Sequence, residues 1–68
     1  SSDLSDVGEL VSIVEKVIDA NPGPVADYHA GKTRALGFLV GQVMKETRGR
    51  ANPQETNRIL KEELDRRA

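Results

Sequence analysis

The sequence has 68 residues, of which 31% are charged, with a formal net charge of −1 and no cysteine. The lack of cysteine excludes disulfide bridges and thiolate metal sites, and the longest nearly apolar run, residues 35–41, is far too short to span a bilayer. A chain of this length buries about 60% of its unfolded surface, so residues 1–68 are predicted to form one domain with a modest core. Because the chain begins Ser1-Ser2 without a methionine, we expect a fragment of a larger protein.

The opening segment is predicted to be an amphipathic helix. Asp6 and Glu9 have the spacing of a capping pair, although Ser2 or Ser5 would start the helix earlier. The prolines of residues 21–24 end it. Its apolar stripe has three- and four-residue steps and consists of Leu4, Val7, Leu10, Val11, Ile13, Val14, Val17 and Ile18.

Two further helices are predicted in the middle of the chain. Pro24 suits the first position of a short helix over residues 25–30, and Gly31 can close that helix in a left-handed conformation. A longer helix is predicted from Thr33 to Arg48, with Gly49 as its terminator. Its apolar side chains are Leu36, Leu39, Val40, Val43 and Met44.

Two glycines within this longer helix call for an explanation. Gly37 and Gly41 are four residues apart, so they share a face, and each costs roughly 0.5–1 kcal/mol relative to alanine inside a helix. We predict that they let a neighbouring backbone pack closely. Phe38 is assigned to the apolar helix, so no aromatic platform for unpaired bases is expected, and any bound RNA would be recognised by shape and backbone.

A last helix is predicted to begin at Asn52-Pro53-Gln54-Glu55. Asn52 can cap it, Pro53 suits the first turn, and Glu55 can reach back to the cap amide. Ile59, Leu60 and Leu64 form its apolar seam. No alternating pattern typical of strands occurs, so the predicted fold is all-α: a small bundle of three longer helices and one short helix.

Two features suggest chemistry that the sequence does not support. Residues 26–33 loosely resemble a phosphate-binding loop, but the first glycine is missing and the preceding residues are predicted to be helical, where that loop needs a strand. His29 is the only histidine and lacks companions for a metal or catalytic set, so we expect a surface or boundary position. No catalytic residue and no metal site are predicted.

Positive charge is concentrated in the second half of the chain. Residues 1–31 carry six acids and one base, whereas residues 32–68 carry nine bases and five acids. Between residues 45 and 53, Lys45, Arg48 and Arg50 surround a helix end, a glycine turn and a helix start, whose free amides would favour a phosphate. Helix capping alone explains the same pattern equally well, so both interpretations remain open at this point.

The order of motifs from residue 21 to residue 64 resembles a known family. The segments 36–45 (Leu-Gly-Phe-Leu-Val-Gly-Gln-Val-Met-Lys) and 49–53 (Gly-Arg-Ala-Asn-Pro), with Gly31-Lys32 before them and 57–60 after them, are similar to the tail domain of the B subunit of aspartyl/glutamyl-tRNA(Asn/Gln) amidotransferase, the GatB/YqeY tail family. Arg48 and Arg50 stand where lysine is equally expected, which preserves the charge.

This resemblance implies a tRNA-binding role without catalysis in the fragment. Members of the family serve a cytoplasmic enzyme that amidates Glu-tRNA(Gln) or Asp-tRNA(Asn) with ATP, Mg and glutamine-derived ammonia, and their helical tail engages the outer corner of tRNA. The implied partners are tRNA, the remaining domains of the B subunit, and the A and C subunits; no cofactor is expected in the tail. The candidate tRNA-binding residues carried over by position are Lys32, Lys45, Arg48, Gly49, Arg50 and Asn52. We expect their cations to form one compact, positively charged corner.

A second hypothesis is a protein-interaction module that docks on a partner subunit through the basic loop or an apolar face. Weak salt dependence of binding would favour it, because contacts to phosphate weaken steeply as salt rises.

Overall fold

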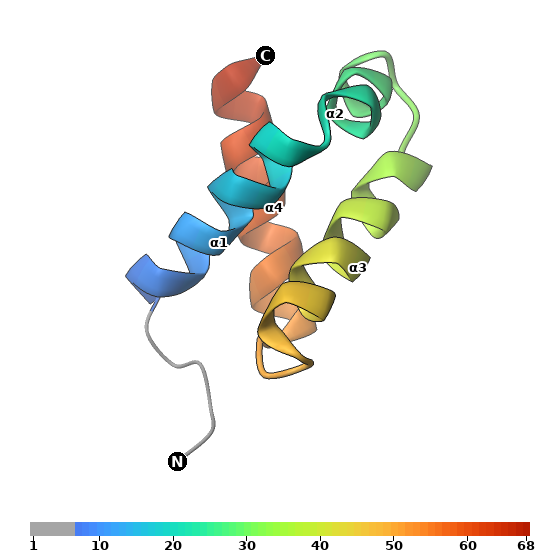
Figure 1. Ribbon diagram of the computed structural model, residues 1–68. Helices are drawn as coiled ribbons and strands as arrows, with labels where there is room; N and C mark the ends of the chain where they lie inside the picture. The colour runs from blue at the N-terminus through green and yellow to red at the C-terminus, as the bar shows by residue number, and fades with distance from the viewer. Residues whose placement is uncertain (1–6) are drawn as a thin grey trace.

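The computed structural model describes residues 7–68, which form four α-helices and no strand (Figure 1). They are α1 (Val7–Ala20), α2 (Pro22–His29), α3 (Arg34–Thr47) and α4 (Pro53–Arg67). The predicted all-α bundle of three longer helices and one short helix is therefore confirmed. The predicted starts of the first helix at Ser2, Ser5 or Asp6, and the stripe residue Leu4, lie outside the described residues.

The core lies between α1, α3 and α4, each of which packs against the other two, while α2 packs mainly on α3. Its buried apolar residues are Leu10, Val14, Val17, Ile18, Leu39, Val43, Ala51, Ile59, Leu60 and Leu64. Those on the helices follow the predicted stripes, because the apolar face of each helix packs into the core, and Ala51 joins them from the loop before α4. Val7 is an exception: it lies in the first turn of α1 and is 53% exposed, so the covered stripe begins at Leu10.

The junction between α1 and α2 is shorter than the sequence suggested. The second helix begins at Pro22, not at Pro24, so Asn21 alone separates the two helices. Both prolines fit the first turn of α2, where a backbone amide has no partner within the helix. The side-chain amide of Asn21 donates a hydrogen bond of 2.8 Å to the carbonyl oxygen of Val17, which satisfies a carbonyl at the end of α1.

The boundaries of α3 agree with the prediction to within one residue at each end. Gly49 is left-handed, with φ of 78°, and its amide donates a hydrogen bond of 2.8 Å to the carbonyl oxygen of Met44. Gly49 therefore takes part in ending the helix, as predicted. Arg48 is also left-handed, with φ of 56° and ψ of 38°, a conformation that is uncommon for a residue with a β-carbon.

Candidate nucleic-acid interface

One face of α3 is left uncovered by the bundle. The exposed residues on it are Arg34, Gly37, Phe38, Gly41 and Lys45, and we call them the α3 strip. At about 100° per residue, these five positions fall within an arc of about 100° around the helix axis. Ala35, Leu39, Val43 and Thr47 lie on the opposite, buried side of the same helix. The strip contains no acidic residue, because Glu46 falls outside the arc.

The cations of this region take part in no ion pair among residues 7–68. The ion pairs of the described chain join Arg58 to Glu55, Arg66 to Glu63, and Arg67 to Asp19. The unpaired cations beside α3 are Lys32, Arg34, Lys45, Arg48 and Arg50, all of which are exposed. Their charges are thus available to an anionic partner.

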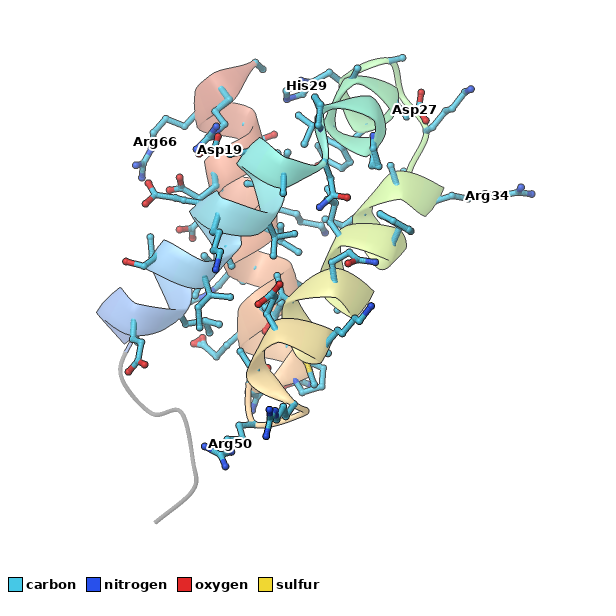
Figure 2. The ribbon with its side chains drawn as sticks, viewed as in Figure 1. Asp19, Asp27, His29, Arg34, Arg50 and Arg66 are labelled. Carbon is cyan, nitrogen blue, oxygen red and sulfur yellow. The ribbon has the colours of Figure 1, made fainter. Side chains whose placement is uncertain are left out.

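These cations are spread along α3 rather than gathered at one corner. Figure 2 shows Arg34 and Arg50 at opposite ends of that helix, whose 14 residues correspond to about 21 Å. Lys32 lies beside Arg34, in the loop before α3. The other candidates, Lys45, Arg48, Gly49, Arg50 and Asn52, lie at the far end or in the loop after it. The expected single charged corner is therefore corrected to two groups of cations joined by the α3 strip.

The start of α4 does not offer the free amides that were expected to favour a phosphate. The side-chain oxygen of Asn52 accepts hydrogen bonds from the amides of Gln54 (2.8 Å) and Glu55 (3.3 Å), and its carbonyl oxygen accepts one from Thr56. Asn52 is thus confirmed as the cap. The predicted return contact from Glu55 is wrong: both of its carboxylate oxygens accept hydrogen bonds of 2.8 Å from Arg58, three residues along the helix.

The glycines of α3 do not serve helix packing. A β-carbon built on Gly37 or Gly41 would have no heavy atom of another group within 4 Å, so the predicted close approach of a neighbouring backbone is wrong. The spacing placed both glycines on one face but could not tell that this face points to solvent. Both glycines instead lie on the exposed α3 strip, so at these two positions no side chain covers the helix backbone.

Phe38 was also assigned to the wrong environment. It is 47% exposed and lies on the α3 strip, so an aromatic surface is present where none was expected. Beside it is a hollow of about 640 Å³ between α2 and α3. Its lining includes Pro24, Asp27, Lys32, Thr33, Arg34 and Phe38. Thr33 precedes the first turn of α3 and makes no capping hydrogen bond with its side chain.

The two features set aside in the sequence lie in helical surroundings. Residues 26–29, at the start of the loosely phosphate-loop-like segment, belong to α2, so a helix stands where that loop needs a strand. His29 is exposed, as expected, and its Nε2 lies 2.8 Å from the carbonyl oxygen of Leu64 in α4. Within residues 7–68 no three histidine, aspartate or glutamate side chains are grouped to hold a metal ion. None of the four helices is long and apolar enough to cross a membrane.

Comparison with known families accounts for this arrangement of helices and motifs. The family described as GatB domain matches residues 2–64. The chain belongs to that family. Its resemblance to the amidotransferase tail, recognised in residues 21–64, thus extends over nearly the whole chain.

Curated relatives of this GatB domain agree with one another. The chain is 64% identical over 63 residues to the B subunit of aspartyl/glutamyl-tRNA(Asn/Gln) amidotransferase from Caldanaerobacter subterraneus subsp. tengcongensis, covering 93% of this chain. Its identity to the subunits of the same name is 61% over 61 residues in Carboxydothermus hydrogenoformans and 59% over 64 residues in Shouchella clausii, covering 90% and 94% of the chain. The GatB domain spans 13% of the length of each relative.

Four residues of the GatB domain's exposed strip were missed as candidates. They are Arg34, Gly37, Phe38 and Gly41. A signal for them was present in the sequence, because positions 34, 37, 41 and 45 recur at helical spacing and hold only glycine or a cation. Apolar spacing marks the face that packs into the core, whereas this second periodicity marks the face left in water.

Proposed function

We propose that this chain binds tRNA through the α3 strip and the loop that follows α3, as the tail of an amidotransferase B subunit. The observation that carries the proposal is that the α3 strip contains no acidic residue and has unpaired cations at both of its ends. Such a face attracts a polyanion, whose phosphates release counterions on binding. The candidates predicted from the sequence, Lys32, Lys45, Arg48, Gly49, Arg50 and Asn52, are kept, and Arg34, Gly37 and Gly41 are added.

The shape of the strip supports an RNA backbone as the ligand. Gly37 and Gly41 carry no side chain, so a sugar-phosphate chain can approach the helix closely at these two positions, beside the ring of Phe38. Arg34 and Lys45 then stand on either side of the point of contact. The distance of about 21 Å along α3 suits several successive phosphates more than one small anion.

The names of the relatives indicate the enzyme to which this tail is proposed to belong. Each of them is a B subunit of an aspartyl/glutamyl-tRNA(Asn/Gln) amidotransferase, and this chain corresponds to 13% of its length. We therefore propose that ATP, Mg and the amidation chemistry belong to other domains of the parent protein, which works with the A and C subunits in the cytoplasm. In this arrangement the tail positions the misacylated tRNA and has no catalytic role.

Titration of the ¹⁵N-labelled chain with tRNA(Gln) or tRNA(Asn) tests the proposal. We expect the backbone amide signals of residues 34–52 to shift most, and the logarithm of the binding constant to fall linearly with the logarithm of the salt concentration. Replacing Lys45, Arg48 and Arg50 together by glutamine is expected to weaken binding and to reduce the salt slope by about one for each phosphate that is no longer neutralised.

A matched control has the same change of charge elsewhere on the surface. Lys16, Arg58 and Lys61 are exposed cations of α1 and α4, outside the α3 strip and its loop. Replacing these three by glutamine is expected to leave most of the affinity intact. Equal losses in both triple variants, or shifts centred on an apolar face with little dependence on salt, would contradict tRNA binding at this site and favour the protein-interaction hypothesis.

A further inference from the structure

We propose that the hollow between α2 and α3 takes one unpaired guanine of the bound RNA, stacked on Phe38. This inference rests on the proposed function and specifies what one part of the same surface recognises. Contacts to phosphate fix the position of an RNA but do not read its sequence, whereas a base held in a pocket does. The hollow therefore adds selectivity to a surface that otherwise attracts any folded polyanion.

The exposed ring of Phe38 supplies a surface on which a base can stack. Phe38 is 47% exposed on a face flanked by cations, and it lines the hollow together with Pro24. An aromatic ring beside a cationic track is the arrangement that proteins use to stack an unpaired base, whatever its identity. The volume of about 640 Å³ falls within the range of small-molecule pockets, so the space accommodates a nucleotide.

Asp27 gives the hollow its preference for guanine. Asp27 is one of the residues that line the hollow, and it forms no ion pair within the described residues. Figure 2 shows its side chain near the loop that joins α2 to α3. Its carbonyl oxygen accepts hydrogen bonds from the amides of Ala30 and Lys32, which anchor this turn at the end of α2. A carboxylate only accepts hydrogen bonds, and two parallel ones need two adjacent donors. Guanine offers that pair on its Watson–Crick edge, at N1–H and at the exocyclic amino group.

Lys32 and Arg34 complete the recognition of a nucleotide. Both line the hollow, and neither is in an ion pair within residues 7–68. Together with Asp27, they give these three lining residues a net charge of +1. Arginine and lysine are the usual partners of phosphate oxygens. Together the lining supplies a surface for the base, an acceptor for its edge and cations for the phosphates beside it.

Chemical probing of tRNA with kethoxal tests this inference directly. Kethoxal modifies N1 and the exocyclic amino group of unpaired guanines, which is the edge assigned to Asp27. With tRNA(Gln) or tRNA(Asn) saturated by the 68-residue chain, we expect one unpaired guanine to be protected. Replacing Phe38 by leucine is expected to abolish that protection and to weaken binding by about 5- to 150-fold, the usual range for one stacked base. Phe38→Tyr keeps the aromatic ring and is expected to retain both the protection of the guanine and the affinity for tRNA.

Asp27→Asn is expected to expose the same guanine to kethoxal again. Glu46→Gln is the matched control, since it removes one exposed carboxylate of α3 outside the strip and makes the same change in net charge. Three results overturn the inference while leaving the proposed function in place: tRNA that binds without protection of any guanine, protection that survives in Phe38→Leu, and equal effects of Asp27→Asn and Glu46→Gln. If the wild-type chain binds no tRNA at low salt, both proposals fall.

Discussion

The hydroxyl of Thr47 accepts a hydrogen bond of 3.4 Å from the backbone amide of Ala51, across the loop that carries Arg48 and Arg50. The same hydroxyl donates to the carbonyl oxygen of Val43 at 3.0 Å. Thr47 is 5% exposed and Ala51 is 2% exposed, so water does not replace these contacts. A buried residue of α3 thus holds together the loop in which two candidate cations stand.

Thr47→Val is expected to lower the free energy of unfolding by about 1–3 kcal/mol, because the buried amide of Ala51 loses its acceptor while the side-chain shape is kept. Urea denaturation measures the loss, and the hydrogen exchange of the Ala51 amide should accelerate more than that of amides inside α4. If the unfolding midpoint is unchanged, the Thr47 hydroxyl has no part in holding the loop.

Thr56→Val is the matched substitution with the opposite expected result. The hydroxyl of Thr56 is fully buried in α4 and has no hydrogen-bond partner among the described residues. A buried hydroxyl without a partner is costly, so a methyl group of similar shape is expected to raise the free energy of unfolding by about 1 kcal/mol. A loss of stability comparable to that of Thr47→Val would show that the Thr56 hydroxyl is satisfied in solution.

Features that depend on neighbouring residues were predictable from the sequence, whereas the exposed face of α3 was not. Asn52 caps α4 and Gly49 helps to end α3 because capping is decided within a few residues. Gly37, Gly41 and Phe38 were misjudged because helical spacing says which residues share a face but not whether another helix covers it. That outcome depends on the packing of α1 and α4 against the far side of α3.

Two substitutions of Asn52 separate its role as the helix cap from its proposed role in RNA binding. Asn52→Ala removes the acceptor for the amides of Gln54 and Glu55, and we expect a loss of about 1 kcal/mol, which lowers the melting temperature by roughly 4–8 °C in a domain of this size. Asn52→Asp keeps the cap, since aspartate is an equally good N-cap, but brings negative charge beside Arg50. This variant is therefore expected to be as stable as wild type and to bind tRNA more weakly. Wild-type affinity for tRNA in Asn52→Asp would place the RNA away from this loop.

Gly41→Ala is expected to raise stability and to lower affinity for tRNA. Alanine gains about 0.5–1 kcal/mol over glycine inside a helix, and the added methyl group meets no heavy atom beyond its chain neighbours and the adjacent helix backbone within 4 Å. The same methyl group covers a part of the helix backbone that the RNA is proposed to approach. Thermal unfolding and tRNA titration on one preparation measure both effects.

Gly49→Ala is expected to have the opposite effect on stability. Gly49 has φ of 78°, so alanine there is strained in spite of the open space around it, and we expect a loss of about 1 kcal/mol. If Gly41→Ala is more stable but binds tRNA as tightly as wild type, the centre of the α3 strip does not approach the RNA backbone closely.

Arg48 combines a strained backbone with a candidate contact, so its two roles can be separated by substitution. Arg48→Gly removes the β-carbon that strains the left-handed conformation at this position, so it is expected to raise the free energy of unfolding by about 0.5–1 kcal/mol. The same substitution is expected to weaken tRNA binding, because the positive charge is lost. Arg48→Lys keeps both the strain and the charge, so it is expected to match wild type in stability and to retain most of the affinity. Titrations at two salt concentrations complete the test, because removing one phosphate contact reduces the salt slope by about one. An unchanged slope in Arg48→Gly would mean that Arg48 does not contact phosphate and that its charge serves only the end of α3.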